Sequence, residues 1–377
     1  MSAPARVLVV GGGVMGCAVA WRLGQAGLSV TVLERALPGA QASSKAAGML
    51  AVQGEAKEPG PFLDLCLASR RRWADFAGEL REASGVDIEL ALRGVLYPAV
   101  DRAGADALRA KAGLQRTLGM RAEIVTSEEM TNLEPGLSDQ LPLGLFAPDD
   151  GQLSSVALAR ALHGAARQAG VSFRIGEVAV GIEQAGGRVR GVQVASGDCL
   201  GADAVVVAGG AWTSLVQGIG LSPGSVRPAR GQLLALATPS AALTRPVFAG
   251  GLGYALPTAD GRTLVGSTME MVGFERAVTV AGLEHMCGVA RRLAPALAQA
   301  TVQDHWCGFR PWTPDELPLM GPCAVEGLHM AAGHFRSGIL LAPITGDAVA
   351  AAVQGAEPVI DLTPFRPDRP ALTRTGG

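Results

Sequence analysis

The feature that most constrains the fold is an apolar run that leads directly into closely spaced glycines near the N-terminus. Arg6–Val10 is rich in β-branched residues, as is typical of a strand buried on both faces. Gly11, Gly13 and Gly16 follow in the spacing G-x-G-x-x-G, and residues 14–25 have the pattern of a helix. A strand, a tight glycine turn and a helix in this order predict the first unit of a Rossmann-like α/β fold.

The same stretch has the features of a dinucleotide site. Gly11 would permit the tight turn, Gly13 would let the backbone approach a pyrophosphate, and Gly16 would let the helix pack closely on the strand. A second apolar strand, Val30–Leu33, ends in Glu34, whose carboxylate could bond the hydroxyls of an adenosine ribose. A glycine-rich turn in an unrelated α/β unit is the competing interpretation. The motif alone does not separate NAD from FAD.

Two further stretches have the small residues that a cofactor site needs. Pro38–Met49 has little side-chain bulk and could lie flat against a planar ligand, although a flexible surface loop would look the same. The strand 203–208 is followed by Gly209 and Gly210. The backbone at its carboxyl end could therefore lie close to a cofactor.

The length and the order of these stretches predict two domains, one of them discontinuous. A chain of 377 residues is long for a single core. Helices are expected at 62–84, 105–118 and 127–133, strand-like alternation at 86–100, and a mostly antiparallel sheet from the runs at 227–236, 253–257 and 263–268. We expect an α/β chain (α+β overall) with a Rossmann-like cofactor domain at 1–50, 145–222 and 321–365. The substrate domain would take 51–144 and 223–320, and 366–377 would be a loosely held tail.

Composition excludes several classes of partner. The net charge is −2, so we expect no nucleic acid and no anionic membrane surface as partner. The N-terminal apolar run is too short and too rich in glycine for a membrane span, and it lacks a cleavage site. The six cysteines form no C-x-x-C pair and no metal-ligand spacing, which predicts reduced thiols, no metal and a cytoplasmic location.

Five motifs together resemble the FAD-dependent D-amino-acid-oxidase superfamily, and within it the glycine oxidases of thiamine biosynthesis. They are Gly11–Gly16 with Glu34-Arg35, Ser43–Leu50, Ala208–Trp212, Trp306–Pro311 and Gly333–Pro343. They occur in the family's order from the N-terminus to about Asp347, so the resemblance covers nearly the whole chain.

The resemblance implies FAD as the cofactor and assigns residues to it. The glycine turn and the small-residue segment would hold the nucleotide, Val178 would lie on the adenine side, and the C-terminal motif would pass along the isoalloxazine ring. The helix from Gly338 would direct its positive N-terminus at the flavin. Beyond Gly11, Gly13, Gly16 and Gly209, the implied contacts are Val14, Met15, Glu34, Arg35, Ala42, Ser43, Ala47, Gly48, Met49, Val178, His334, Phe335, Arg336, Ser337, Gly338, Ile339 and Leu340.

The resemblance also implies how a small amino acid would bind. Arg310 would hold the substrate carboxylate bidentately, and Tyr254 would donate its phenol to the same group. Arg336 would turn its backbone carbonyl toward the substrate amine, and its side chain could narrow the cavity or add positive charge. Met49 would lie at the mouth of the cavity over the flavin. His334 is expected to be a buried core histidine, because hydride transfer needs no general base from the protein.

Two positions depart from the family's pattern and affect the predicted substrate pocket. Leu252 stands where a glycine oxidase carries histidine, and Trp312 replaces a small residue after Arg-Pro. Both would reshape the pocket and leave glycine, sarcosine, D-alanine and a bulkier amine as alternative substrates. Cys307 is one position away from the cysteine that tethers FAD in monomeric sarcosine oxidases, so we expect non-covalent FAD.

The predicted function is oxidative deamination of glycine or another small amino acid, with O2 reduced to H2O2 and the imine hydrolysed or used for thiazole synthesis. The first alternative is a dehydrogenase of the same fold, acting on D-amino acids or sarcosine, that passes electrons to a quinone or carrier. The second is a non-catalytic or tRNA-modifying flavin protein, which would need a basic face. We also expect a homo-oligomer.

Overall fold

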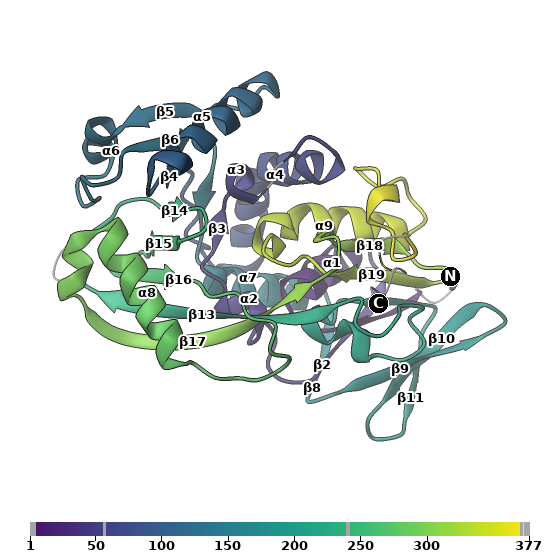
Figure 1. Cartoon of the computed structure of the whole chain (residues 1–377). Coiled ribbons are helices and arrows are strands. Elements are labelled where there is room, and N and C mark those ends of the chain that lie inside the picture. Colours follow the sequence, from purple (N-terminus) through teal and green to yellow (C-terminus); the bar gives the residue numbers. More distant parts are fainter. Residues whose placement is uncertain (1–4, 56–57, 239–241, 370–371, 373–377) are drawn as a thin grey trace.

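The computed structural model describes residues 5–55, 58–238, 242–369 and 372. Two large β-sheets organise these residues, one of six strands and one of eight. Figure 1 shows the six-stranded sheet with its helices in one half of the molecule and the eight-stranded sheet in the other.

The six-stranded sheet is parallel except at one edge. Its order is β18-β19-β12-β1-β2-β8, and only the β18–β19 pair is antiparallel. In this order the strands are Leu319–Pro322, Leu328–Ala332, Ala204–Val207, Arg6–Val10, Ser29–Glu34 and Ser172–Ile175. In β1, Val10 pairs with Leu33 of β2 on one side and with Val207 of β12 on the other. The parallel strands therefore bring residues 11, 35 and 208 to one edge of the sheet.

Four helices pack beside this sheet. They are α1 (Val14–Gln25), α4 (Pro61–Ser84), α7 (Ser155–Gln168) and α9 (Gly338–Val353). α1 and α9 contact the strands, α1 also contacts α7 and α9, and α4 packs on α7 and α9. Trp21, Trp73 and Phe76 are fully buried between α1 and α4, with Phe76 edge-on to both indoles. Gly346 lets α9 approach α1 closely, because a Cβ there would lie 3.0 Å from Ala18 Cβ.

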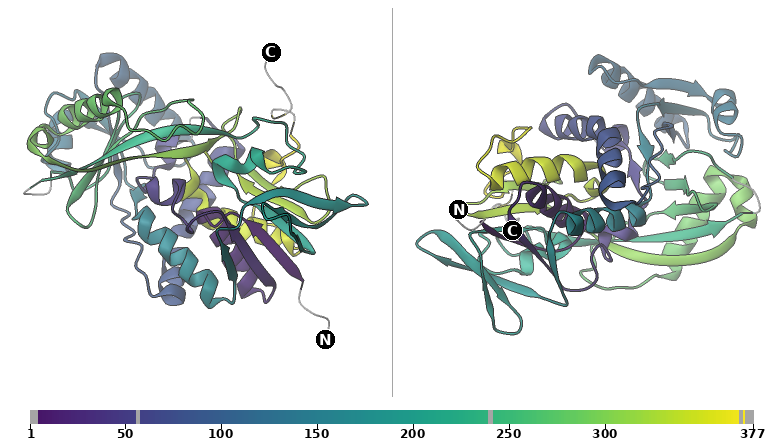
Figure 2. Two further views of the ribbon diagram at one scale, coloured as in Figure 1. Left: turned by 90° about the horizontal axis from the view of Figure 1, so that it is seen from below. Right: turned by 180° about the vertical axis from the view of Figure 1, so that it is seen from behind.

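Two small sheets flank the six-stranded sheet. β9 (Ala179–Ala185), β10 (Arg188–Val194) and β11 (Cys199–Gly201) form a three-stranded antiparallel sheet, which projects as a teal arm in both views of Figure 2. β3 (Met49–Leu50) pairs with β7 (Gly151–Gln152).

The eight-stranded sheet has the order β17-β13-β16-β15-β14-β4-β6-β5 and is antiparallel except between β14 and β4. In this order the strands are Thr301–Trp312, Arg227–Ala237, Arg262–Gly266, Gly253–Pro257, Val247–Ala249, Val95–Pro98, Leu143–Ala147 and Glu123–Thr126. α8 (Val280–Leu293) packs on β13, β15 and β16, as Figure 1 shows. α5 (Arg102–Thr117) and α6 (Ser127–Leu133) lie against β5 and β6. The short elements of the chain are α2 (Ala42–Lys45), α3 (Val52–Glu55), η1 (Gly210–Leu215), η2 (Pro295–Gln299) and η3 (Thr363–Phe365).

The predicted fold class is confirmed: a Rossmann-like parallel sheet and a mostly antiparallel sheet. Most predicted elements form within a few residues of their expected bounds, and Thr126 caps α6 in a capping box with Glu129. Most strands of each large sheet come from segments assigned to one domain, but β6 (Leu143–Ala147) and β18 (Leu319–Pro322) cross the predicted boundaries at 144/145 and 320/321. The division of the chain into two domains stays a prediction. Among the described residues, no helix is both long and apolar enough to cross a bilayer.

Two predictions about local structure are wrong. The expected strands across 86–100 reduce to β4, Val95–Pro98, because Glu89 adopts a positive φ of 58° and the residues before β4 have no ladder partner beyond a bridge at Ala91. The prediction of a loosely held tail is wrong for Arg369 and Leu372, which are both buried. Arg369 donates to Asp315 at 2.6 and 2.9 Å and to the Pro318 carbonyl at 2.9 Å. The rest of the predicted tail after 369 lies outside the described residues.

Candidate active site

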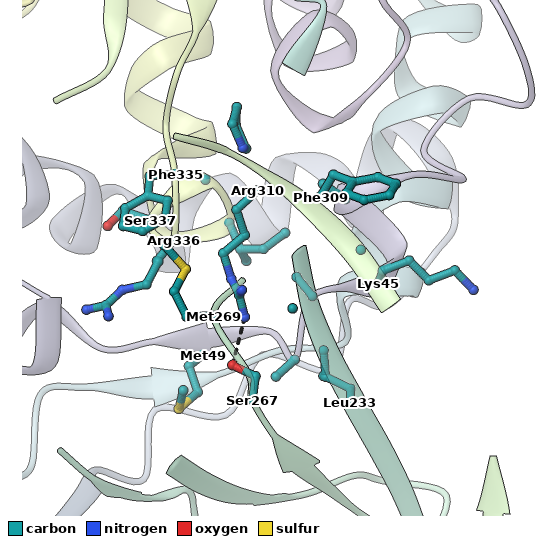
Figure 3. Close-up of a pocket in the computed structure, with 18 of the residues that line it drawn as sticks. Lys45, Met49, Leu233, Ser267, Met269, Phe309, Arg310, Phe335, Arg336 and Ser337 are labelled. Carbon is teal, nitrogen blue, oxygen red and sulfur yellow. Dashed lines mark hydrogen bonds between the residues drawn. The ribbon is translucent and has the colours of Figure 1, made fainter. Parts of the chain in front are cut away.

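A cavity of about 680 Å³ opens between the two large sheets. The six-stranded side contributes the glycine turn, the segment 42–49 and the segment 331–340, and the eight-stranded side contributes β13, β15, β17 and the residues after β16. Figure 3 shows side chains from both halves directed into this space. Its size is within the usual range for ligand pockets.

At one end of the cavity, the glycine turn has the close contacts that only glycine allows. Gly11 has a φ of 104°, and a Cβ there would lie 2.5 Å from the Ala208 carbonyl oxygen. A Cβ on Gly16 would lie 1.9 Å from the Gly11 carbonyl oxygen. These glycines therefore let α1 begin directly at the edge of the sheet, with its N-terminus and the Gly13, Val14 and Met15 backbone on the cavity.

Glu34 supplies a buried carboxylate next to this turn. It is 6% exposed, and its two oxygens accept hydrogen bonds from the Gly12 amide at 2.7 Å and the Ala36 amide at 2.8 Å. The ion pairs of the described residues include none with Glu34. Since a carboxylate can accept about four hydrogen bonds, two acceptor sites remain for hydroxyl donors. The residues at this end therefore fit an adenosine ribose.

The small-residue segment is anchored to its surroundings. The Ser43 hydroxyl accepts a hydrogen bond from the Val14 amide at 3.0 Å, and the Ser155 hydroxyl donates to the Ala46 carbonyl at 2.6 Å. Gly48 has a φ of 94°, and a Cβ there would lie 2.0 Å from the Leu153 carbonyl oxygen. The interpretation as a free surface loop is therefore wrong. Ala42, Ser43, Ala47, Gly48 and Met49 all line the cavity.

The C-terminal motif forms the opposite wall. Phe335 has a φ of 46°, which is strained for a bulky residue, and its amide donates to the Pro311 carbonyl at 3.0 Å. α9 starts at Gly338 with no acidic residue in its first turn, so its positive end faces the cavity uncompensated. His334 is 3% exposed, bonds the Thr345 hydroxyl at 3.0 Å, and has its pKa lowered by burial to about 3. It is therefore the neutral core histidine that the sequence predicts.

Arg310 reaches into the cavity from β17 with neutral partners only. Its guanidinium donates to the Ser267 hydroxyl at 2.7 Å and to the Thr268 carbonyl at 3.2 Å, and Figure 3 shows the contact with Ser267. Gly231 makes room for it, because a Cβ at that position would lie 2.1 Å from an Arg310 nitrogen. Burial lowers the pKa of Arg310, and an arginine guanidinium keeps its charge in proteins. The ion pairs of the described chain include none for this cation, which makes it an anion site.

Tyr254 lies beside this cation on β15. It is 8% exposed, and a Cβ on Gly266 would lie 2.5 Å from its hydroxyl oxygen, so the phenol lies close against the backbone. Burial raises the pKa of Tyr254, and the positive charge of Arg310 opposes that rise. The phenol therefore keeps its proton at neutral pH and can donate it in a hydrogen bond.

Arg336, Met49 and Leu252 also line the cavity, as predicted. Arg336 donates to Glu55 from two nitrogens, at 2.6 and 2.9 Å, so its side chain is held in an ion pair. Trp312 is the exception: it is not part of the cavity wall, and the Arg227 guanidinium lies 5.7 Å from its ring centroid. The prediction that Trp312 shapes the substrate pocket is therefore wrong.

Some predicted cofactor residues lie outside the cavity wall: Gly11, Gly16 and Glu34, described above, and also Arg35, Gly209 and Val178. Arg35 stacks on Trp212, with its guanidinium carbon 4.6 Å from the ring centroid, and Gly209 lies against Thr213. Val178 is 41% exposed and follows β8, the neighbour of the strand that ends in Glu34. Arg35, Gly209 and Val178 belong to the sheet edge near Glu34, and their roles toward FAD stay predictions.

Several residues of the site had no sequence signal. Gly231, Ser267 and Thr268 surround Arg310, and Glu55 holds Arg336. None of them belongs to a motif, and Glu55 meets Arg336 only through the tertiary fold. Within the described residues no group of three or more His, Cys, Asp or Glu side chains is placed to hold a metal ion.

Comparison with known proteins gives one consistent family. A family model described as DAO, FAD dependent oxidoreductase, matches residues 6–352. Glycine oxidase from Geobacillus kaustophilus is 37% identical over 95% of this chain and 95% of its own length. The bifunctional protein ThiO/ThiG from Synechocystis sp. is also 37% identical, over 98% of this chain and 54% of its own length. The chain therefore spans about half the length of that bifunctional relative.

Solved structures agree with the sequence comparison. The crystal structure of glycine oxidase from G. kaustophilus has a TM-score of 0.92 at 36% identity, covering 99% of this chain and all of that one. The iminodiacetate oxidase from Chelativorans sp. has a TM-score of 0.86 at 27% identity, covering 96% of this chain and 99% of that one. The glycine turn, the buried Glu34 and the unpaired Arg310 thus occur in a fold shared with flavin enzymes. This chain belongs to the DAO family of FAD-dependent oxidoreductases.

Proposed function

We propose that this protein catalyses the FAD-dependent oxidative deamination of a small amino acid, with glycine as the first candidate. The observation that carries the proposal is the Arg310 guanidinium, which has only neutral partners and shares its cavity with the dinucleotide motif. Glycine oxidases at 32–37% identity support the choice of substrate.

Arg310 and Tyr254 would bind the substrate carboxylate. A guanidinium offers two parallel N–H donors that match the two oxygens of a carboxylate, and Tyr254 can add a third donor beside it. The carboxylate would thus replace water around a partly buried cation and fix the orientation of the α-carbon. Arg336 lines the same cavity, and its backbone carbonyl is proposed to accept a hydrogen bond from the substrate amine.

Residues of the six-stranded side would hold FAD. Glu34 would accept hydrogen bonds from the ribose hydroxyls, and the backbone at Gly13 and Val14 would approach the pyrophosphate. The N-terminus of α9 at Gly338 would place its positive end toward the flavin. When bound, FAD accepts a hydride from the α-carbon and passes the electrons to O2.

The overall reaction balances as glycine, O2 and water giving glyoxylate, ammonia and H2O2. The first product would be the imine, which water hydrolyses. The same imine could instead serve thiamine thiazole synthesis, a role supported by the similarity to bifunctional ThiO/ThiG proteins. The cytoplasmic location, the homo-oligomeric state and the non-covalent attachment of FAD remain proposals as well.

A peroxide-coupled screen of glycine, sarcosine, D-alanine and larger D-amino acids tests this function. We expect turnover with glycine, sarcosine or D-alanine above that with larger D-amino acids. Reduction of the enzyme by glycine without air, followed by admission of air, then separates an oxidase from a dehydrogenase. Rapid reoxidation with formation of H2O2 supports the proposal, whereas slow reoxidation that a quinone accelerates would favour the dehydrogenase.

A further inference from the structure

A second, smaller cavity lies next to the first, and the two share part of their walls. The smaller cavity has a volume of about 330 Å³ and is lined by Pro59–Phe62 and Asp315–Leu317, among other residues. Glu55, Phe335, Arg336 and Ser337 line both cavities. The Glu55 carboxylate and the Arg336 guanidinium therefore form part of the wall between them, 2.6 Å apart.

The position of Glu55 is fixed by the short helix α3 that carries it. The amide of Gln53 donates to the buried Asp150 carboxylate at 3.1 Å, and the Gln53 side chain donates to Gln115 at 2.8 Å. A Cβ on Gly54 would lie 2.9 Å from both Tyr97 and Phe248, so α3 is packed closely against these rings. Glu55 is thus presented to Arg336 by an anchored element.

The position of Arg336 is less restricted beyond this pair. Its backbone follows Phe335, whose positive φ sets the direction of the chain. Its side chain is 37% exposed, and Figure 3 shows it pointing away from Arg310. The ion pairs of the described residues give it Glu55 as its carboxylate partner, and Asp315 of the smaller cavity is already paired with Arg369.

The two arginines of the cavity therefore differ in charge balance. Arg310 has neutral partners and can receive an anion, while Arg336 is neutralised by Glu55. Lys45 also borders the cavity, but it points away from Arg310 and its ammonium lies 6.0 Å from the Trp306 ring centroid. The charge of Glu55 reaches the centre of the site: burial is the main cause of the raised pKa of Tyr254, and Glu55 adds to it.

We propose that Glu55 is a specificity-determining residue, because it holds the Arg336 guanidinium and so limits the cavity to one carboxylate per ligand. Arg310 neutralises the single carboxylate of a monocarboxylate amino acid, and the Glu55–Arg336 pair stays intact. A ligand with a second anionic group on its amine or side chain would be repelled by the Glu55 carboxylate. Its second anionic group would also have to compete with Glu55 for Arg336. Without that charge, Arg336 becomes a second anion site in the same cavity.

The inference rests on the proposed function. Binding of simple carboxylates tests the role of Glu55 separately from the proposed oxidation of glycine. The probes are acetate and malonate, titrated into the FAD-loaded enzyme by calorimetry, and glycine and iminodiacetate as substrates. Iminodiacetate is glycine with a second carboxymethyl group on the amine. The variants are Glu55→Gln, Arg336→Gln, the double variant, and Glu58→Gln as the matched control. Glu58 is an exposed acid of the smaller cavity, and the described ion pairs do not join it to Arg336.

We expect Glu55→Gln to strengthen malonate binding at least tenfold and to raise kcat/KM for iminodiacetate relative to glycine at least tenfold, since a charge-assisted hydrogen bond to an arginine has about this effect. Acetate binding should change less than threefold. The gain should disappear in the double variant, and Glu58→Gln should behave as wild type.

Two results would overturn the inference alone: malonate affinity unchanged in Glu55→Gln while acetate still binds, or a gain that persists in the double variant. Failure of the wild-type holoenzyme to bind acetate or glycine would contradict the proposed function, and the inference with it.

Discussion

Arg310 is available to a ligand because each group that it bonds is neutral. Ser267 and Thr268 orient its guanidinium, and Gly231 leaves the space that it occupies. The resemblance indicates Arg310, but only the fold shows that the described ion pairs leave it unpaired. A guanidinium in this environment binds most strongly a carboxylate whose two oxygens accept hydrogen bonds from two of its N–H groups.

Replacement of Arg310 by lysine tests this geometry. The charge stays, but the bidentate donor pair is lost, so we expect kcat/KM for glycine to fall about 100-fold or more, mainly through KM. FAD content should not change, because Arg310 lies away from the glycine turn. Arg276→Lys is the control, since Arg276 is an exposed arginine that bonds Gln41. Wild-type kinetics in Arg310→Lys would remove Arg310 from the site.

Tyr254 is expected to contribute one hydrogen bond to the same carboxylate. Tyr254→Phe should lower kcat/KM about tenfold, as expected when one donor to a charged group is removed. Tyr97 is the control: it donates to Asp150 at 2.7 Å outside the cavity wall, so Tyr97→Phe should lower stability and leave kcat/KM within about twofold. Equal kinetic effects of the two changes would contradict the assignment of Tyr254.

At the scale of elements, the local sequence pattern predicts the strands and helices that carry motifs. It fails where a strand forms only if a partner strand lies beside it. The turn from β1 to α1 follows from three glycines that exclude side chains. The alternation at 86–100 says nothing about a partner strand, and only Val95–Pro98 finds β6 and β14 beside it. Glu55 could not be predicted, because its partner Arg336 comes from the far end of the chain.

Asp150 holds several elements together and should make stability depend on pH. This fully buried carboxylate accepts hydrogen bonds from Tyr97 of β4, Gln53 of α3 and Arg70 of α4. Burial raises its pKa from 3.8 to about 6. The folded state therefore binds a proton more tightly than the unfolded state, so this contribution is present at low pH and is lost as pH rises toward 6.

The comparison with Asp150→Asn isolates that contribution. Between about pH 4.5 and pH 7.5, the free energy of unfolding of the wild type should fall relative to the variant by on the order of 2 kcal/mol. Urea unfolding followed by tryptophan fluorescence measures the difference at each pH. A difference that stays constant, or that rises with pH, would show that Asp150 titrates near its usual range.

At the scale of the whole molecule, the site needs both sheets in fixed positions. The sequence predicts the discontinuous cofactor domain, because motifs at both ends of the chain belong to one nucleotide site. It does not predict the contacts between α1, α4 and α9, where Asp347 bonds Arg22 at 2.6 Å and Arg72 at 3.0 Å. Those residues are far apart in sequence, so their pairing depends on helix packing alone.

Asp347→Asn tests how much this charge cluster stabilises the fold. The three side chains are 13–26% exposed, and without the Asp347 carboxylate Arg22 and Arg72 keep only Glu79 as their shared acidic partner among the described ion pairs. We expect a loss of about 2 kcal/mol in the free energy of unfolding. Asp106→Asn is the control, since the Asp106–Arg109 pair is mostly exposed and should contribute less than about 0.5 kcal/mol. Similar losses in both variants would contradict a special role for the cluster.

The most direct test of the central claim is an anaerobic titration of the purified yellow protein with glycine, followed by the visible absorbance of the flavin. We expect glycine to abolish the absorbance of oxidised FAD, and an Arg310→Ala variant with equal FAD content to need far higher glycine concentrations. A protein that takes up no FAD, or bound FAD that glycine, sarcosine and D-alanine all leave oxidised, would contradict it.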